Sequence, residues 1–151
     1  MRRAALLLAV VTCLSGAPAA QAPADLQPVA TMKQLMLDVI HPASNSLLVA
    51  INRGGPGDEK AWAEARRSAM TLAESGNLLI MRNRAAAWVA DARLLTAAGT
   101  EAYRAAETKN ARALAAVADR LDASCTTCHT QFRPNVFPAR AGSPSGPAES
   151  R

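Results

Sequence analysis

Apolar side chains recur every three or four residues along most of this chain, which is the spacing of one face of an α-helix. Alanine is abundant and aromatic residues make up only 3% of the chain, so the composition also favours helices over sheets. The pattern divides into four helical stretches joined by short connections. Four amphipathic helices of this kind pack as a bundle, and the fold class we predict is therefore all-α, an antiparallel four-helix bundle.

The first predicted helix runs from about residue 26 to residue 51. Its apolar positions before Pro42 are Val29, Met32, Met36, Val39 and Ile40, and Leu47, Leu48 and Ile51 continue the apolar face beyond it. A proline inside a helix removes a backbone donor and crowds the preceding turn, so we expect a kink at Pro42 or a split near His41. The glycine-rich segment 53–57 ends this element.

The second predicted helix begins near Asp58, a suitable N-cap, and the third covers about residues 84–108. The positions expected to be buried are Trp62, Ala65, Ala69, Leu72, Ala73 and Gly76 in the second helix, and Trp88, Ala92, Leu95, Ala102 and Ala106 in the third. Gly99 is a weak point of the third helix but need not break it. Asp91 and Arg93 are expected to be ordinary surface charges.

The fourth predicted helix begins at Asn110, again a good N-cap, and ends at Pro134. Leu114, Ala118, Leu121, Cys125 and Cys128 follow one another at intervals of four, three, four and three residues. Two cysteines therefore continue the apolar stripe that should face the core. Residues 138–151 are rich in proline, glycine and serine, and we expect them to be disordered.

The first residues have the composition of a secretory signal peptide. Two arginines precede an apolar run of eleven residues from Ala4 to Leu14, and small residues follow. Ala17-Pro18-Ala19 is an A-x-A-like cleavage site, so we expect residues 1–19 to be removed, with the cut no later than about residue 22. The run is too short to span a bilayer. We therefore predict export to the periplasm.

Cleavage leaves about 130 of the 151 residues, which is the size of one domain, and we assign the domain to residues 26–135. It also removes two of the 17 basic residues, so that 15 remain against 12 acidic ones and the net charge changes from +5 to +3. A charge of this size indicates no preference for nucleic acid or for a membrane surface. No membrane span is expected in the mature chain.

The most specific chemical pattern is the run Cys125-Thr126-Thr127-Cys128-His129. C-x-x-C-H is the attachment pattern of a c-type haem, in which two thiols form thioethers to one porphyrin and the histidine binds its iron. A redox dithiol would need a βαβ pattern, which is absent, and a zinc site would need further ligands that the chain hardly offers. Export agrees with the haem interpretation, because bacteria attach such haems outside the cytoplasmic membrane. We predict one haem c, held by Cys125 and Cys128, with His129 as the proximal ligand.

These residues resemble the cytochrome c prime and cytochrome c-556 superfamily. The resemblance covers about residues 26–135: C-x-x-C-H lies on the last helix, Phe132 and Arg133 follow it, and the stretch 32–36 looks like the family's first helix, which covers the distal face of the haem. It implies that Arg133 lies near the haem edge. The chain departs from the family in having Met32 where a basic residue is frequent and in the proline that interrupts its first helix.

The sequence offers several alternatives for the sixth ligand of the iron. The resemblance puts Met36 at the distal position, where a thioether would ligate the iron and raise its reduction potential. Met32, one turn earlier, could replace it, or both methionines could simply pack in the core. His41 would give a bis-histidine haem, but it lies about 140° around an ideal helix from Met36. A further alternative is that no side chain binds there.

From these observations we predict a periplasmic monohaem c-type cytochrome that carries single electrons between unidentified redox partner proteins. It is not expected to be an enzyme, since a peroxidase would need a distal acid–base group and only His41 is a candidate. The alternative is a five-coordinate protein, similar to cytochrome c prime, that binds gases such as nitric oxide or carbon monoxide. A homodimer is common among bundles of this kind, and the sequence does not determine it.

Overall fold

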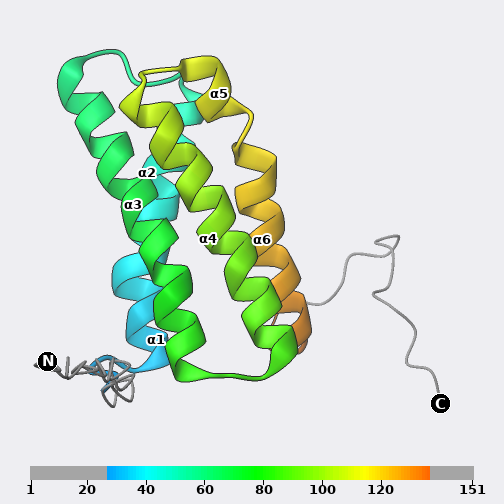
Figure 1. The fold of residues 1–151 in the computed structure, drawn as a ribbon. Helices are drawn as coiled ribbons and strands as arrows, with labels where there is room; N and C mark the ends of the chain where they lie inside the picture. The colour runs from blue at the N-terminus through cyan, green and yellow to red at the C-terminus, as the bar shows by residue number, and fades with distance from the viewer. Residues whose placement is uncertain (1–26, 137–151) are drawn as a thin grey trace, which may run out of the picture.

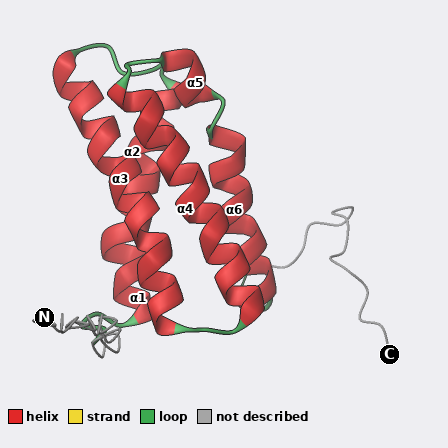
Figure 2. Cartoon of the chain, viewed as in Figure 1, coloured by secondary structure: helices red, strands yellow, loops and turns green. Residues whose placement is uncertain are grey.

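A computed structural model describes residues 27–136 of the chain, so the predicted signal peptide and the predicted tail lie outside the described residues. The described part is entirely helical and contains no strand (Figures 1 and 2). Its elements are α1 (Met32–Gln34), the π-helical η1 (Leu35–Ile40), α2 (His41–Asn52), α3 (Glu59–Arg82), α4 (Ala86–Glu107), α5 (Ala111–Ala115) and α6 (Ala118–Phe132). No helix within this range is long and apolar enough to cross a bilayer.

Four long helical segments lie side by side as a bundle, as the apolar spacing predicts (Figure 1). The first segment joins α1, η1 and α2 without interruption, and the others are α3, α4 and α6. Each packs mainly against its neighbour in chain order: α2 on α3, α3 on α4, and α4 on α6. The first and last segments touch only slightly, so the bundle is weakly closed along that edge.

Small residues allow α3 and α4 to approach each other closely. A Cβ atom added to Gly99 would lie 2.8 Å from the Cα atom of Ala73, and one added to Gly76 would lie 2.7 Å from the carbonyl oxygen of Ala92. Gly99 is buried and α4 runs through it unbroken. The glycine is therefore explained by the interface rather than by a break in the helix.

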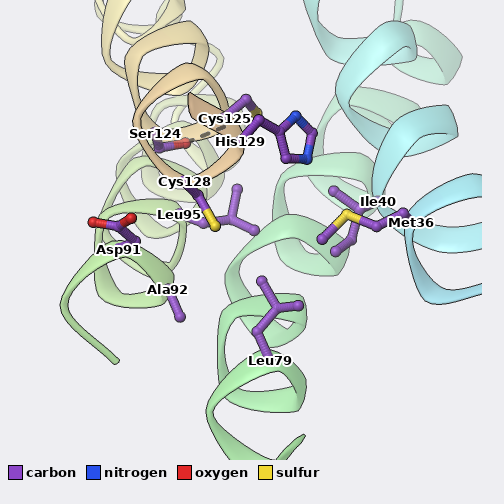
Figure 3. Close-up of a pocket in the computed structure, with 10 residues that line it drawn as sticks. All are labelled: Met36, Ile40, Leu79, Asp91, Ala92, Leu95, Ser124, Cys125, Cys128 and His129. Atoms are coloured by element: carbon purple, nitrogen blue, oxygen red, sulfur yellow. Dashed lines mark hydrogen bonds between the residues drawn. The ribbon is translucent and has the colours of Figure 1, made fainter. Parts of the chain in front are cut away.

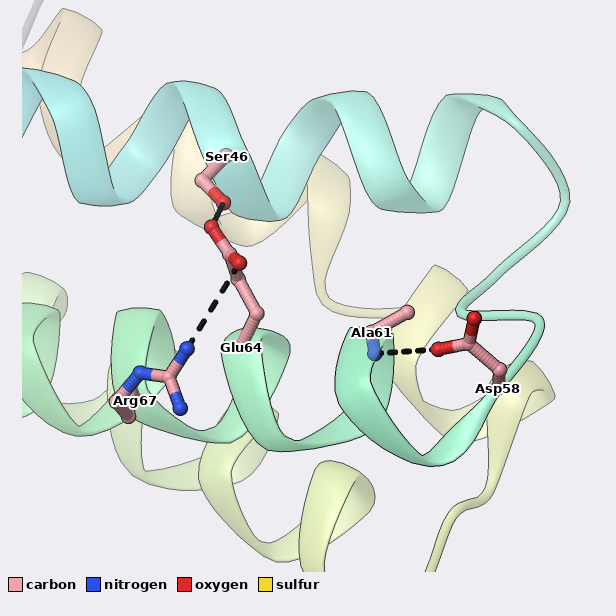
Figure 4. A network of polar contacts seen from close by, with 5 residues as sticks. All are labelled: Ser46, Asp58, Ala61, Glu64 and Arg67. Carbon is pink, nitrogen blue, oxygen red and sulfur yellow. Dashed lines mark hydrogen bonds and ion pairs between the residues drawn. The ribbon is translucent and has the colours of Figure 1, made fainter.

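A side-chain cap sets the start of the second predicted helix. The Asp58 carboxylate accepts a hydrogen bond of 2.7 Å from the backbone N–H of Ala61, which confirms the N-cap of α3 (Figure 4). One turn later, Glu64 accepts a hydrogen bond from Ser46 of α2 and pairs with Arg67 at 3.8 Å (Figure 4). The contacts of Glu64 are exposed and add little to stability, and only the one with Ser46 joins α2 to α3.

The first helix differs from its prediction at two places, at its start and at Pro42. It begins at Met32, capped by Thr31, and not near residue 26, and Val29 is fully exposed. Pro42 neither splits nor ends the helix. Instead η1 widens the turns just before it, and the His41 N–H donates to the carbonyl of Met36, five residues back. A π-helical turn relieves the crowding that a proline ring imposes on a regular α-helix.

The fourth helix is not continuous, contrary to its prediction. Asn110 caps a helix start, accepting from the Ala113 N–H at 2.9 Å, but α5 ends at Ala115 and α6 begins only at Ala118. Between them Val117 is buried, and it fills the core where the chain turns. Leu114 therefore belongs to a different helix from the two cysteines. The cysteines nevertheless line a pocket inside the bundle.

The core is built mostly from leucine and alanine. Its largest fully buried apolar side chains are Leu35, Leu47, Leu72, Leu114, Val117 and Leu121. Alanines fill most of the remaining core positions on α3 and α4, as the sequence predicts for Ala65, Ala69, Ala92, Ala102 and Ala106.

Candidate functional site

A pocket lies inside the bundle where η1, α3, α4 and α6 meet (Figure 3). Its free volume is about 40 Å³. The lining residues are Met36, Ile40, Leu79, Asp91, Ala92, Leu95, Ser124, Cys125, Cys128 and His129. The structure thus brings all three residues of the C-x-x-C-H pattern to one pocket, together with one of the predicted distal ligands.

The helix α6 positions the three C-x-x-C-H side chains. Residues at i, i+3 and i+4 share one face of a helix, and Cys125, Cys128 and His129 have this spacing. All three are partly buried. The Ser124 hydroxyl donates to the Leu121 carbonyl at 2.7 Å and lies 4.0 Å from the Cys125 sulfur, so it borders the pocket as well. Both cysteines are free thiols.

Burial disfavours the thiolate form of both cysteines. It raises the pKa of Cys128 to about 11, with smaller contributions from Asp91 and Cys125. Burial also raises the pKa of Cys125, although a hydrogen bond with Ser124 acts in the opposite direction. Reactive redox dithiols have lowered pKa values. The pair therefore lacks the electrostatics of a dithiol catalyst.

His129 is held as a neutral imidazole. Burial lowers its pKa, and the positive charge of Arg133 lowers it further. A neutral imidazole keeps a lone pair that a metal ion can bind. In Figure 3 the ring points away from α6 towards the first helical segment, where Met36 lies.

Of the three predicted distal side chains, only Met36 lines the pocket. It extends from η1 into the pocket from the side opposite α6 (Figure 3). Met32 is partly buried and packs against the core outside the pocket, and His41 is exposed. The structure therefore separates Met36 from the two other candidates.

Arg133 follows the last residue of α6, and its backbone N–H donates to the carbonyl of His129 at 2.8 Å. It is exposed and does not line the pocket, but its charge reaches the imidazole of His129. The preceding Phe132 packs edge-on against Trp88 of α4, with ring centroids 4.9 Å apart. The Trp88 indole donates to the carbonyl of Leu79 at 2.9 Å. Through these two contacts, Trp88 of α4 joins α3 and α6 beside the pocket.

Asp91 is not the surface charge that the sequence suggests. Only 8% of the residue is exposed, and its Oδ2 atom is buried without a hydrogen-bond partner among the described residues. Burial raises the pKa of its carboxyl group. Its spacing from Trp88 and Leu95 puts it on the buried stripe of α4. That spacing could have revealed it, but its charged side chain argues for exposure.

The donor set of this pocket fits a covalently held haem. Two thiols and an imidazole lie on one wall, a thioether lies on another, and the other lining residues are mostly apolar. The first segment and α6, which carry these donors, contact each other only slightly. No three His, Cys, Asp or Glu side chains within residues 27–136 group closely enough to hold a metal ion unaided.

No family model matches this chain, and neither a curated protein nor a solved structure matches it.

Proposed function

We propose that this protein is an exported monohaem c-type cytochrome that carries single electrons. Cys125 and Cys128 hold the haem, His129 is the proximal ligand and Met36 the distal one. The observation that carries the proposal is the meeting of the C-x-x-C-H residues of α6 with Met36 of η1 in one pocket. When bound, the haem supplies an iron that is reduced and oxidised by one electron.

The states of the ligating side chains support this assignment. Cys125 and Cys128 are free thiols and not a disulfide, as thioether formation requires, and the imidazole of His129 is neutral, which is the form that binds iron. A methionine thioether opposite a histidine favours the ferrous state and raises the reduction potential. Ile40, Leu79 and Leu95 give the pocket an apolar lining beside these groups.

An electron carrier agrees with this lining better than an enzyme does. A haem peroxidase needs an acid–base group on the distal side. The only histidines of the chain are His41, which is exposed, and His129, which serves as the proximal ligand. The distal wall instead offers Met36 and Ile40.

The second candidate is a five-coordinate protein that binds small gases. It is favoured by one observation: η1 packs on α3 and hardly on α6, so the distal wall is free to move away from the iron. In that case Met36 would pack beside the haem without binding it, and a diatomic gas would occupy the open position.

Covalent attachment is tested by producing the full chain with haem-maturation machinery and measuring the intact mass of the denatured protein. We expect one haem per mature chain and none in the double variant Cys125→Ser/Cys128→Ser. A mature protein that loses its haem on denaturation would refute the assignment. The same mass gives the cleavage site, which we expect between residues 19 and 22.

The distal ligand is tested with Met36→Ala and the matched control Met32→Ala, a methionine one turn away that does not line the pocket. We expect Met36→Ala to turn a low-spin ferrous spectrum into a high-spin one that shifts readily with carbon monoxide. The control should keep the spectrum of the original protein. Identical spectra for all three proteins would exclude Met36 as a ligand.

A further inference from the structure

The pocket contains one charged group that neither haem attachment nor iron ligation uses. Asp91 of α4 is 8% exposed, and its Oδ2 atom is fully buried without a partner among residues 27–136. It lies on the Cys128 side of the pocket, away from Met36 (Figure 3), and its charge acts on the Cys128 thiol. The ion pairs of the described residues join other groups: Arg67 with Glu64, Lys109 with Glu59, and Arg120 with Glu101.

A buried carboxylate oxygen without a partner, such as Oδ2 of Asp91, is costly, because it has lost its hydration and gained no hydrogen bond in return. Replacement by an apolar or amide side chain would remove this cost. Its presence in the wall of a pocket therefore points to a positively charged occupant that balances it. Ferric iron in a porphyrin is such an occupant, and it carries one more positive charge than ferrous iron.

We propose that Asp91 lowers the reduction potential of the haem iron by stabilising its ferric state from the Cys128 side of the pocket. The inference rests on the proposed function. When the iron gives one electron to a partner protein, its charge rises by one, and a nearby carboxylate stabilises this state more than the ferrous one. Because the carboxylate is buried, solvent screens the interaction less than at the surface. Asp91 thus opposes the effect of the Met36 thioether.

Asp122 of α6 provides a matched control. Its charge also reaches the C-x-x-C-H segment, since it contributes to the raised pKa of Cys125, but it is exposed. Asp122→Asn removes the same charge as Asp91→Asn from a solvated position. A general effect of net charge would move the potential equally in both variants, whereas a buried charge in the pocket would act only through Asp91.

The experiment is a potentiometric titration of the holoprotein and of the variants Asp91→Asn, Asp91→Glu and Asp122→Asn at pH 7. We expect Asp91→Asn to shift the ferric–ferrous equilibrium roughly tenfold towards the ferrous state, which raises the midpoint potential by about 59 mV. Asp91→Glu keeps the charge and should stay near the original value, and Asp122→Asn should shift much less. The absorption spectrum should be the same in all four proteins, because the iron ligands are unchanged.

Salt provides a second readout that a purely structural role would not produce. The shift caused by Asp91→Asn should persist at high ionic strength, while any shift caused by Asp122→Asn should disappear. If Asp91→Asn does not accumulate with haem, the smaller Asp91→Ser is titrated instead, with the same expected direction. A midpoint that does not rise in either variant, or rises equally in Asp122→Asn, overturns the inference although the cytochrome assignment stands. A wild-type chain without haem overturns both.

Discussion

His129 lies partly buried near the end of α6, and both burial and the charge of Arg133 lower the pKa of its imidazole. The neutral form that results is the one that ligates iron. Burial also raises the pKa values of the two neighbouring thiols. At the scale of single residues, the pocket therefore presents a neutral imidazole beside two free thiols.

The lowered pKa of His129 predicts how the stability of the haem-free chain depends on pH. The unfolded chain binds a proton near pH 6.5, whereas the folded chain resists it until a lower pH. The free energy of unfolding should thus be constant well above pH 6.5 and fall as the pH drops through the folded pKa. Urea unfolding at pH 7.5 and pH 5.5 measures this difference.

The matched variant His129→Gln lacks the titrating group. It should show a smaller loss of stability between the two pH values than the original haem-free chain. An equal loss in both proteins would mean that burial of the imidazole does not oppose its protonation.

At the scale of elements, the most extensive contact in the bundle is the one between α3 and α4, and Gly99 lies within it. A Cβ atom there would meet the backbone of Ala73, which cannot rotate away as a side chain can. We expect Gly99→Ala to destabilise the protein by about 1–3 kcal/mol, the usual cost of overpacking. Chemical denaturation of the holoprotein measures the change.

Gly57 is the matched control for this prediction. An added Cβ atom would meet nothing within 4 Å there, because Gly57 lies in the exposed connection before α3. Gly57→Ala should therefore leave the denaturation midpoint nearly unchanged. Equal midpoints for the two variants would contradict the close approach of α3 and α4.

Helix boundaries could be predicted where a few adjacent residues determine them. Asp58 and Asn110 cap helices as expected, because capping depends on a few adjacent residues. The turn at Val117 carries no glycine or proline, and it exists because burying Val117 in the core outweighs continuing the helix. The π-helical turns of η1 could not be predicted either. Pro42 indicates that the helix is distorted, but it does not indicate that the distortion is a π-helix.

The parts of the candidate site that a sequence motif encodes could be predicted. The parts that depend on how the helices pack could not. The spacing of Cys125, Cys128 and His129 put them on one helix face from sequence alone. The separation of Met36 from Met32 and His41 required the path of the first segment. Asp91 was missed because sequence reasoning assigns carboxylates to the surface, and only its spacing from Trp88 argued otherwise.

The weakly closed edge between the first segment and α6 matters at the scale of the whole molecule. The pocket lies among these two segments, α3 and α4, and α3 and α4 contact each other far more than either contacts the first segment or α6. A haem that bonds to α6 and to Met36 would join the two weakly connected segments. Haem attachment should therefore stabilise η1 and α6 more than it stabilises the α3–α4 contact.

Hydrogen exchange of the holoprotein and the haem-free chain tests this expectation. Amide protection should rise most in η1 and in the C-terminal half of α6, and least in the middle of α3 and α4. A uniform rise along all helices would contradict a local closing of this edge. It would indicate instead that the haem-free chain unfolds as one unit.

The most direct test of the whole account is the absorption spectrum of the mature protein, produced with haem-maturation machinery, reduced and then exposed to carbon monoxide. We expect a low-spin ferrous spectrum that carbon monoxide leaves unchanged, because Met36 would occupy the sixth position of an iron held by His129. A high-spin spectrum that shifts readily with carbon monoxide would contradict the electron carrier and favour gas binding. A protein without haem absorption would contradict the assignment altogether.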